Sequence, residues 1–382
     1  MKVSTYIYRS NWDRSFTKPS DPSKSLVILF GSSDIDTISK PLDEIIEFYV
    51  GATVIGASTC GEIYQDELLD DSLVVAVIEF STTTIKSIHK ILKDTKDSHR
   101  CGQEIATYLV EDDLRGVFVL SDGLKVNGSQ LTEGISSTLP NSVSVTGGLA
   151  GDDDRFEKTW VVVDGRPCSS CITAVGFYGD DIRIGYGSRG GWDRLGIERV
   201  VTKSVDNVLY ELDSQPALSL YKRYLGDEAD GLPATGLLFP LELRSSEDSR
   251  DSKVRTILGV DEKDQSITFA GDIPEGSLVT LMKANYDRLI DGAIYAAESI
   301  DMGEYNGENI LSIAISCVGR RLVLKQRVEE ELEDSLSILP SSIKQIGFYS
   351  YGEISPLSSG KCDLHNQTMT LTTIWEKDAS TT

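Results

Sequence analysis

A short pattern of glycines closed by an acidic residue occurs three times in the sequence. The copies occupy residues 56–63 (GASTCGEI), 147–152 (GGLAGD) and 347–354 (GFYSYGEI). Each copy follows a stretch with the apolar spacing of a helix, and apolar runs of strand length lie before that helix and after the copy. Glycine permits close approach of a backbone or a ligand, so such a turn either lines a pocket or repeats a packing contact. The pattern predicts three copies of one unit: strand, helix, strand, turn, strand.

Strand-like runs dominate the chain, and helices interrupt them. The runs before the three helices cover residues 26–30, 116–120 and 311–316, and the runs after the turns cover residues 73–80, 172–178 and 368–374. Runs of adjacent strands with occasional helices favour an α+β fold over one parallel sheet. We therefore expect layered mixed and antiparallel sheets with helices, internally repeated as strand-helix-strand-strand units. We also expect a hairpin over Ser81 and Thr82 and an antiparallel meander through residues 160–186.

A glycine-rich stretch at residues 185–196 breaks this alternation. Such a stretch is typical of a linker, and 382 residues are enough for two or three domains. The sequence therefore predicts two domains, residues 1–195 and residues 196–382.

The chain is strongly acidic, with 37 basic and 60 acidic residues and a formal net charge of −23. Phosphate binding needs a basic surface, so this balance argues against nucleic acid and anionic membranes as partners. The first residues lack the apolar segment of a signal peptide, and the longest apolar runs are well short of the ~20 residues that span a membrane. We expect a cytoplasmic protein with no nucleic-acid partner and no membrane partner.

Six cysteines show no framework spacing, which predicts reduced thiols. Cys168 and Cys171 form a C-x-x-C pair in a turn between two predicted strands. Zinc usually needs two further ligands at suitable spacing, and a redox pair usually begins a helix. This pair is therefore interpreted as a turn without metal or redox function.

The motifs resemble a known family when they are taken in order. Residues 56–63 are similar to the signature of the FIST N-terminal domain, and residues 146–156 (TGGLAGDDDRF) continue the match. Residues 347–354, followed by His-Asn-Gln-Thr at 365–368, resemble the signature of the FIST C-terminal domain. The resemblance covers nearly the whole chain. It identifies the predicted domains as FIST N-terminal (residues 1–195) and FIST C-terminal (residues 196–382).

This resemblance implies a sensory module of signal transduction that binds a small ligand, with an amino acid as one suggested class. Bacterial members work beside histidine kinases, chemoreceptors or cyclic-di-GMP enzymes, so the expected partner is a separate signalling protein. No kinase, cyclase or DNA-binding motif follows residue 374. Some similar proteins bind haem and sense nitric oxide, which gives the alternative function: a haem-based sensor that regulates a histidine kinase or a cyclic-di-GMP enzyme.

The acids of the three turns, Glu62, Asp152 and Glu353, have two readings. A carboxylate can bind a ligand ammonium or guanidinium group, or it can accept N–H bonds within its own turn. His365 also has two readings, as the axial ligand of haem or as a buried hydrogen-bonding group that anchors the last strand. The candidate ligand-binding residues are Ser58, Thr59, Glu62, Gly151, Asp152, Arg155, Tyr349, Tyr351, Glu353 and His365, and His365 is the metal ligand if haem is bound.

Ser58, Thr59 and Cys60 invite comparison with a catalytic nucleophile. Nucleophilic catalysis needs an adjacent base, and no histidine lies near in the sequence. The segment also differs from the Gly-x-Ser-x-Gly elbow, and no Lys-Ser/Thr follows Gly61 as in a P-loop. We therefore expect no enzymatic activity, and an unrecognised hydrolase is the third hypothesis.

Overall fold

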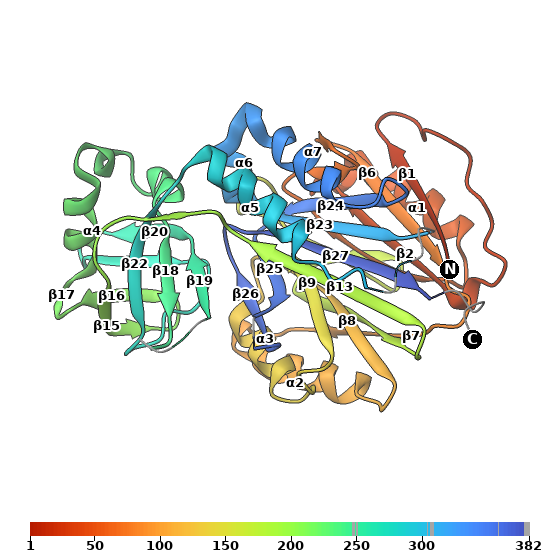
Figure 1. Cartoon of the computed structure of the whole chain (residues 1–382), viewed down its shortest axis with the longest axis horizontal. Helices are drawn as coiled ribbons and strands as arrows, with labels where there is room; N and C mark the ends of the chain where they lie inside the picture. The colour runs from red at the N-terminus through yellow and green to blue at the C-terminus, as the bar shows by residue number, and fades with distance from the viewer. Residues whose placement is uncertain (247–248, 250, 304, 306–308, 358, 378–382) are drawn as a thin grey trace.

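The computed structural model describes residues 1–246, 249, 251–303, 305, 309–357 and 359–377. These residues form a large body of three six-stranded sheets with helices, and a smaller lobe around a nine-stranded sheet. The lobe projects to the left of the body in Figure 1. The predicted α+β class, with mixed and antiparallel sheets, is confirmed.

Each sheet of the body is built in the same order. The first contains β1 (Lys2–Tyr8), β6 (Leu73–Glu79), β2 (Ser25–Gly31), β3 (Thr53–Ser58), β10 (Val161–Val163) and β11 (Arg166–Cys168). The second contains β7 (Thr84–Ile91), β12 (Cys171–Tyr178), β8 (Leu114–Ser121), β9 (Ser144–Leu149), β25 (Gly352–Pro356) and β26 (Cys362–His365). The third contains β13 (Ile182–Arg189), β27 (Met369–Glu376), β23 (Leu311–Cys317), β24 (Lys344–Ser350), β4 (Glu62–Tyr64) and β5 (Glu67–Leu69).

The predicted repeat is confirmed by these orders. In every sheet the third and fourth strands are parallel, and the second strand is antiparallel to the third. A helical connection joins each parallel pair, as a crossover between parallel strands requires. These connections are α1 (Ile35–Phe48), α3 (Gly128–Ser136), and α6 (Val318–Leu324) with η5 (Lys325–Arg327) and α7 (Val328–Ile338).

The three units exchange strands in a ring. The hairpin that follows each glycine-acid turn leaves its own sheet: β4 pairs with β24, β10 pairs with β3, and β25 pairs with β9. The edge strands β7 and β13 likewise pair with the last strand of the following unit. The expected hairpin over Ser81 and Thr82 is therefore wrong, since β6 and β7 lie in different sheets. The expected meander is also wrong, because β10, β12 and β13 lie in three sheets.

The first glycine of each motif copy lies opposite a residue of the neighbouring parallel strand. The register pairs are Gly56 with Leu29, Gly147 with Val119, and Gly347 with Ala314. A Cβ added at any of the three would lie closer than 3.0 Å to the carbonyl oxygen of that partner, a separation that real Cβ atoms essentially never show. These glycines therefore allow the parallel strands to pack, which explains why the pattern repeats.

The strands of the body enclose an apolar core between the sheets. Every residue of β2 is buried, which accounts for its continuous apolar run. Phe30 on β2 and Phe348 on β24 meet in this core with ring centroids 4.5 Å apart. Helices α2 (Ser98–Leu109) and α3 pack on each other, as do α5 (Tyr286–Glu298) and α7.

The lobe is inserted between β13 and α5 and has its own apolar core. Its sheet order is β19-β18-β22-β15-β16-β21-β20, with β14 beside β22 and β17 beside β16. Its strands are β14 (Asp193–Arg194), β15 (Arg199–Val205), β16 (Val208–Leu212), β17 (Gln215–Pro216), β18 (Leu241–Arg244), β19 (Ser252–Arg255), β20 (Ile257–Asp261), β21 (Ser266–Phe269) and β22 (Leu278–Lys283). Its helices are α4 (Ala217–Leu225), η3 (Gly226–Gly231) and η4 (Ala234–Leu238), and two further 3-10 turns in the body are η1 (Pro22–Lys24) and η2 (Thr95–Asp97). The chain enters the lobe close to the predicted division at residues 195 and 196. From β23 onward, the strands complete the sheets of the body, and the two-domain division stays a prediction.

Cys168 and Cys171 are joined by a disulfide, so reduced thiols were the wrong prediction for this pair. Ser170, in the turn between the two cysteines, has a positive φ of 58°. The other four cysteines are buried free thiols.

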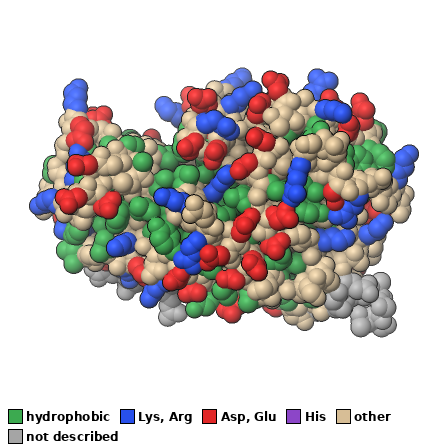
Figure 2. Space-filling view, turned by 90° about the horizontal axis from the view of Figure 1, so that it is seen from above, with side chains coloured by type: hydrophobic (Ala, Val, Ile, Leu, Met, Phe, Trp, Pro, Cys, Tyr) green, Lys and Arg blue, Asp and Glu red, His purple; other side chains and the backbone are tan. Residues whose placement is uncertain are grey.

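In the part of the chain that the structure describes, no helix is both long and apolar enough to cross a membrane. On the face shown in Figure 2, basic and acidic side chains are interspersed, and Lys and Arg do not form a continuous basic surface there.

Candidate ligand-binding cavity

A cavity of about 710 Å³ lies where the lobe meets the body. Its size is that of a small-molecule site, and junctions between domains are common places for such sites. The lobe contributes Asn207, Pro233, Ala234, Leu237, Thr256, Ile257, Leu258, Phe269, Ala270, Gly271 and Asp272. The body contributes Thr95, Gly123, Leu124, Val126, Asn127, Gly128, Leu149, Asp154, Phe156, Cys317, Val318, Leu322 and Tyr351. The wall is therefore mostly apolar and belongs to both parts of the molecule.

An aromatic pair forms part of the body side of this cavity. The rings of Phe156 and Tyr351 stack with centroids 4.6 Å apart and planes 8° from parallel. Asp152 holds both residues, because its Oδ1 accepts bonds from the Phe156 main-chain N–H, at 3.0 Å, and from the Tyr351 hydroxyl. Its Oδ2 accepts the N–H groups of Glu157 and Lys158 at 2.8 and 2.7 Å. Asp152 therefore holds the main chain of Phe156 and the hydroxyl of Tyr351 in place, but it does not itself line the cavity.

Asp122, which the sequence reasoning missed, shapes the neighbouring wall. This buried carboxylate accepts the N–H groups of Leu124 and Lys125 at 2.8 Å through Oδ1. Its Oδ2 accepts the N–H of Ser170 at 2.7 Å. The signal was the Ser-Asp-Gly sequence directly after a buried strand, which favours a turn held by its Asp side chain.

Most of the other predicted site residues meet around the motif turns rather than in the cavity. Gly151 donates its N–H to the carbonyl oxygen of Ser58 at 3.0 Å, and Ser58 Oγ accepts the N–H of Trp160 at the same distance. Tyr349 exchanges main-chain bonds with the first turn and donates its hydroxyl to Glu331 at 2.7 Å. Arg155 is exposed and donates to Ser33 Oγ at 2.6 Å. Among the predicted site residues, Tyr351 lines the cavity directly.

Glu62 and Glu353 occupy equivalent places in the first and third turns. Glu62 accepts hydrogen bonds from Thr59 and from the N–H and hydroxyl of Ser72, the latter at 3.1 and 2.7 Å. Glu353 accepts from Ser350 at 2.7 Å and from the N–H and hydroxyl of Thr368 at 3.2 and 2.8 Å. Each acid therefore joins a hydroxyl of its own turn to a later segment of the chain, at Ser72 or at Thr368.

Burial raises the pKa of Glu62 to about 7 and that of Glu353 to about 8, above the usual value of 4.5. A raised pKa means that the folded protein holds a proton which the unfolded chain releases, so stability declines as the pH rises from 4.5 through 7 and 8. For Glu62 the rise corresponds to about 3 kcal/mol. Glu62→Gln, which mimics the protonated acid, is expected to make the free energy of unfolding less dependent on pH and larger than that of the wild type at pH 9.

Urea unfolding at pH 5 and pH 9 measures this difference, with Glu133→Gln as a control at an exposed carboxylate on α3. If the wild type and Glu62→Gln lose the same free energy of unfolding between pH 5 and pH 9, Glu62 is not the source of the pH dependence.

His365 lies outside this cavity, on a second one of about 530 Å³. Its Nε2 lies 3.1 Å from the carbonyl oxygen of Ser355, and burial lowers its pKa. The second cavity also carries Glu242, Asp251 and Lys253 in its wall. Haem needs a largely apolar slot, and the wall of this cavity carries charged side chains, so these surroundings do not fit haem. Among the described residues, no group of three or more His, Cys, Asp or Glu side chains is placed to hold a metal ion.

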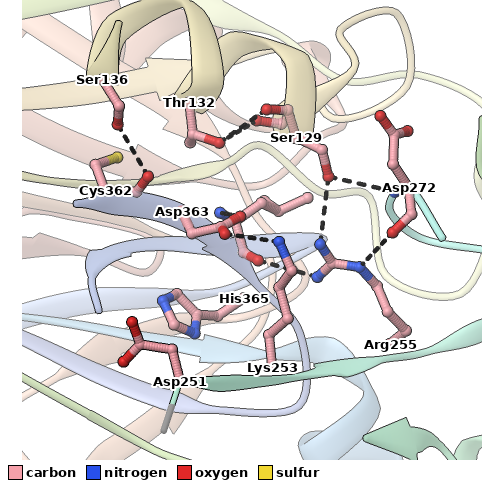
Figure 3. Close-up of polar contacts among 12 residues, drawn as sticks. Ser129, Thr132, Ser136, Asp251, Lys253, Arg255, Asp272, Cys362, Asp363 and His365 are labelled. Carbon is pink, nitrogen blue, oxygen red and sulfur yellow. Dashed lines mark hydrogen bonds and ion pairs between the residues drawn. The ribbon is translucent and has the colours of Figure 1, made fainter. Parts of the chain in front are cut away.

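Between the two cavities, a polar joint fastens the lobe to the body (Figure 3). The fully buried Arg255 donates to the carbonyl oxygens of Asp272 and Leu364 at 3.2 and 3.0 Å, and to Ser129 Oγ at 3.4 Å. Lys253 forms an ion pair with Asp363 at 2.6 Å. Arg255 and Lys253 belong to β19 of the lobe, whereas Ser129 and Asp363 belong to the body.

These features define a class of protein: a two-part α+β module with an apolar cavity beside a bonded joint between the parts. The FIST N domain matches residues 25–215 and the FIST C domain matches residues 217–356, so the chain belongs to the FIST family of sensory signalling domains. A curated relative, an uncharacterized protein of Methanocaldococcus jannaschii, is 24% identical over 352 residues. The match covers 82% of this chain but only 64% of the length of that relative.

Proposed function

We propose that this protein is a non-enzymatic sensor whose small ligand binds in the cavity between lobe and body. The observation that carries the proposal is the composition of the cavity wall, which comes from both parts and is mostly apolar. A ligand that contacts both parts stabilises the arrangement in which they lie together. Membership of a sensory family supports the same function.

The path from ligand to output is proposed to run through the joint. Thr256 and Ile257 of the cavity wall directly follow Arg255, so a change of contact in the cavity acts on the strand that fastens the lobe. The signal then passes to a separate partner, for which a histidine kinase, a chemoreceptor and a cyclic-di-GMP enzyme are the candidates. The haem-based alternative gains no support from the surroundings of His365.

Thermal unfolding in the presence of a small-molecule library, with amino acids included, tests the proposal. A ligand at 100 times its Kd stabilises the folded protein by about 2.7 kcal/mol, which raises the melting temperature. Ala234→Trp, which fills the cavity from η4, is expected to abolish the rise. Val205→Trp, at an exposed site of the same lobe, is expected to retain it. A ligand whose effect persists in Ala234→Trp binds elsewhere, and a library without any stabilising compound contradicts the proposal.

A further inference from the structure

The wall of the cavity between lobe and body is acidic and apolar. Asp154 and Asp272 line it, and none of the lining residues, all of which the structure describes, is Lys, Arg or His. A carboxylate or phosphate ligand would lose its hydration there without gaining a cationic side chain. The wall therefore favours a ligand that is neutral or positively charged. The net charge of −23 adds to this preference, since a negative protein raises the local concentration of cations.

Asp272 is the carboxylate best placed for such a charge. Its Oδ1 accepts from Asn127 Nδ2 at 3.0 Å and its Oδ2 from Gln130 Nε2 at 2.8 Å. A carboxylate has about four acceptor positions, so these two bonds leave capacity for an ammonium group. Arg255 donates to the main-chain oxygen of Asp272, and Figure 3 shows the carboxylate turned away from that guanidinium. No ion pair to this carboxylate occurs within the described ranges.

A buried hydroxyl lies behind the same wall. Thr256 is only 4% exposed, and its Oγ1 is buried without a hydrogen-bond partner in the described structure. Nearly all buried polar groups in proteins are hydrogen-bonded, and an unpaired one costs roughly 1–3 kcal/mol. This oxygen has no exposed surface toward the cavity, so the preference for an amine rests on Asp272 and on the charge of the wall.

The remaining wall accommodates an apolar body. The stacked rings of Phe156 and Tyr351 lie on one side, and Ile257 and Phe269 come from the lobe. Aromatic faces also attract a cation, so these rings do not oppose an amine.

We propose that the ligand is an amine with an aromatic or branched apolar body and no carboxylate, and that its ammonium group binds Asp272. This inference rests on the proposed function and narrows it. An amino acid, whose carboxylate would face the acidic wall, is then a poorer ligand than the amine of the same side chain.

Calorimetry with three probes of one shape tests the charge preference. The probes are 2-phenylethylamine, 2-phenylethanol and phenylacetate, which are cationic, neutral and anionic. A hydrogen bond to a charged group contributes roughly 1.5–3 kcal/mol, so the amine is expected to bind at least about 10-fold more tightly than the alcohol. Phenylacetate is expected to bind most weakly. Phenylacetate binding as tight as that of the amine, or no binding of the amine, would overturn the inference.

Variants locate the ammonium group. Asp272→Asn is expected to remove the preference for the amine over the alcohol while the alcohol still binds, which also shows that the cavity remains folded. Asp154→Asn is the matched control at the other carboxylate of the wall and is expected to keep the preference. An amine preference that survives Asp272→Asn contradicts the assignment to this residue.

The two proposals fail in different ways. In one outcome, the alcohol or phenylacetate binds, Ala234→Trp abolishes that binding, and the amine is not preferred. This outcome overturns only the proposal that the ligand is an amine bound by Asp272. The absence of any ligand at the cavity, from these probes and from the library, overturns the proposed function as well.

Discussion

Gly347→Ala is expected to destabilise the protein by about 3 kcal/mol or more. The new methyl group would overlap the carbonyl oxygen of Ala314 on the parallel neighbour, and a main-chain atom cannot move aside as a flexible side chain does. Overpacking of a buried site usually costs roughly 1–3 kcal/mol, and a clash with backbone lies at or above the upper end of that range. Chemical denaturation measures the change as a lower midpoint.

Gly259→Ala is the matched control for this prediction. Gly259 is also in a strand, but a Cβ added there meets nothing within 4 Å. Its stability is expected to remain within about 0.5 kcal/mol of the wild type, as for most substitutions outside special positions. A similar loss in both variants would indicate that the general cost of changing glycine, rather than the packing of parallel strands, sets the effect.

Glu331→Ala is expected to cost about 3–5 kcal/mol, because it leaves a buried guanidinium without its anion. Arg320 and Glu331 are both fully buried, and Arg320 Nε donates to Glu331 Oε2 at 2.9 Å. Glu331 also accepts from Ser316 and Tyr349 through Oε1 at 3.0 and 2.7 Å. The free energy of unfolding in urea measures the loss.

The neighbouring residue on α7 supplies the control. Glu330 forms an exposed ion pair with Arg327, and Glu330→Ala is expected to change stability little because exposed pairs are screened by water. Arg320 also donates to the carbonyl oxygen of Leu289 on α5 at 2.7 Å. Because Glu331 in turn accepts from Ser316 and Tyr349 of the third sheet, Glu331→Ala breaks the bonded link between α5 and that sheet. Equal effects of the two alanine variants would show that the buried pair is dispensable.

The repeated unit was predictable because its signals are local. Helical spacing, apolar runs and glycine positions all lie within one unit, and the structure reproduces them in three sheets. The exchange of hairpins was not predictable from the same signals. A short run such as Glu62–Tyr64 has the same pattern whichever sheet it joins, since pairing depends on contacts with residues nearly 300 positions away.

The candidate site was predictable only in part. Tyr351 lines the cavity, whereas the buried acids Glu62 and Glu353 bond to their own turns and to Ser72 and Thr368. Ile257 and Phe269 were not recognised, because apolar residues on strands have the same appearance in a core as in a cavity wall. The candidate ligand-binding cavity lies at the junction of the inserted lobe and the body, and no local sequence pattern marks that junction.

The ring of exchanged strands also sets the order in which the chain completes its structure during synthesis on the ribosome. The first sheet has all its strands once Cys168 has been made, and the lobe has its own once Lys283 has been made. The second sheet lacks β25 and β26, and the third lacks β27, until nearly the whole chain has emerged. Contacts this distant in sequence close slowly, and incomplete sheets leave open edges. The nascent protein therefore holds unfinished sheet edges in the body for most of its translation, and the lobe that forms half of the cavity has all its strands before the second and third sheets do.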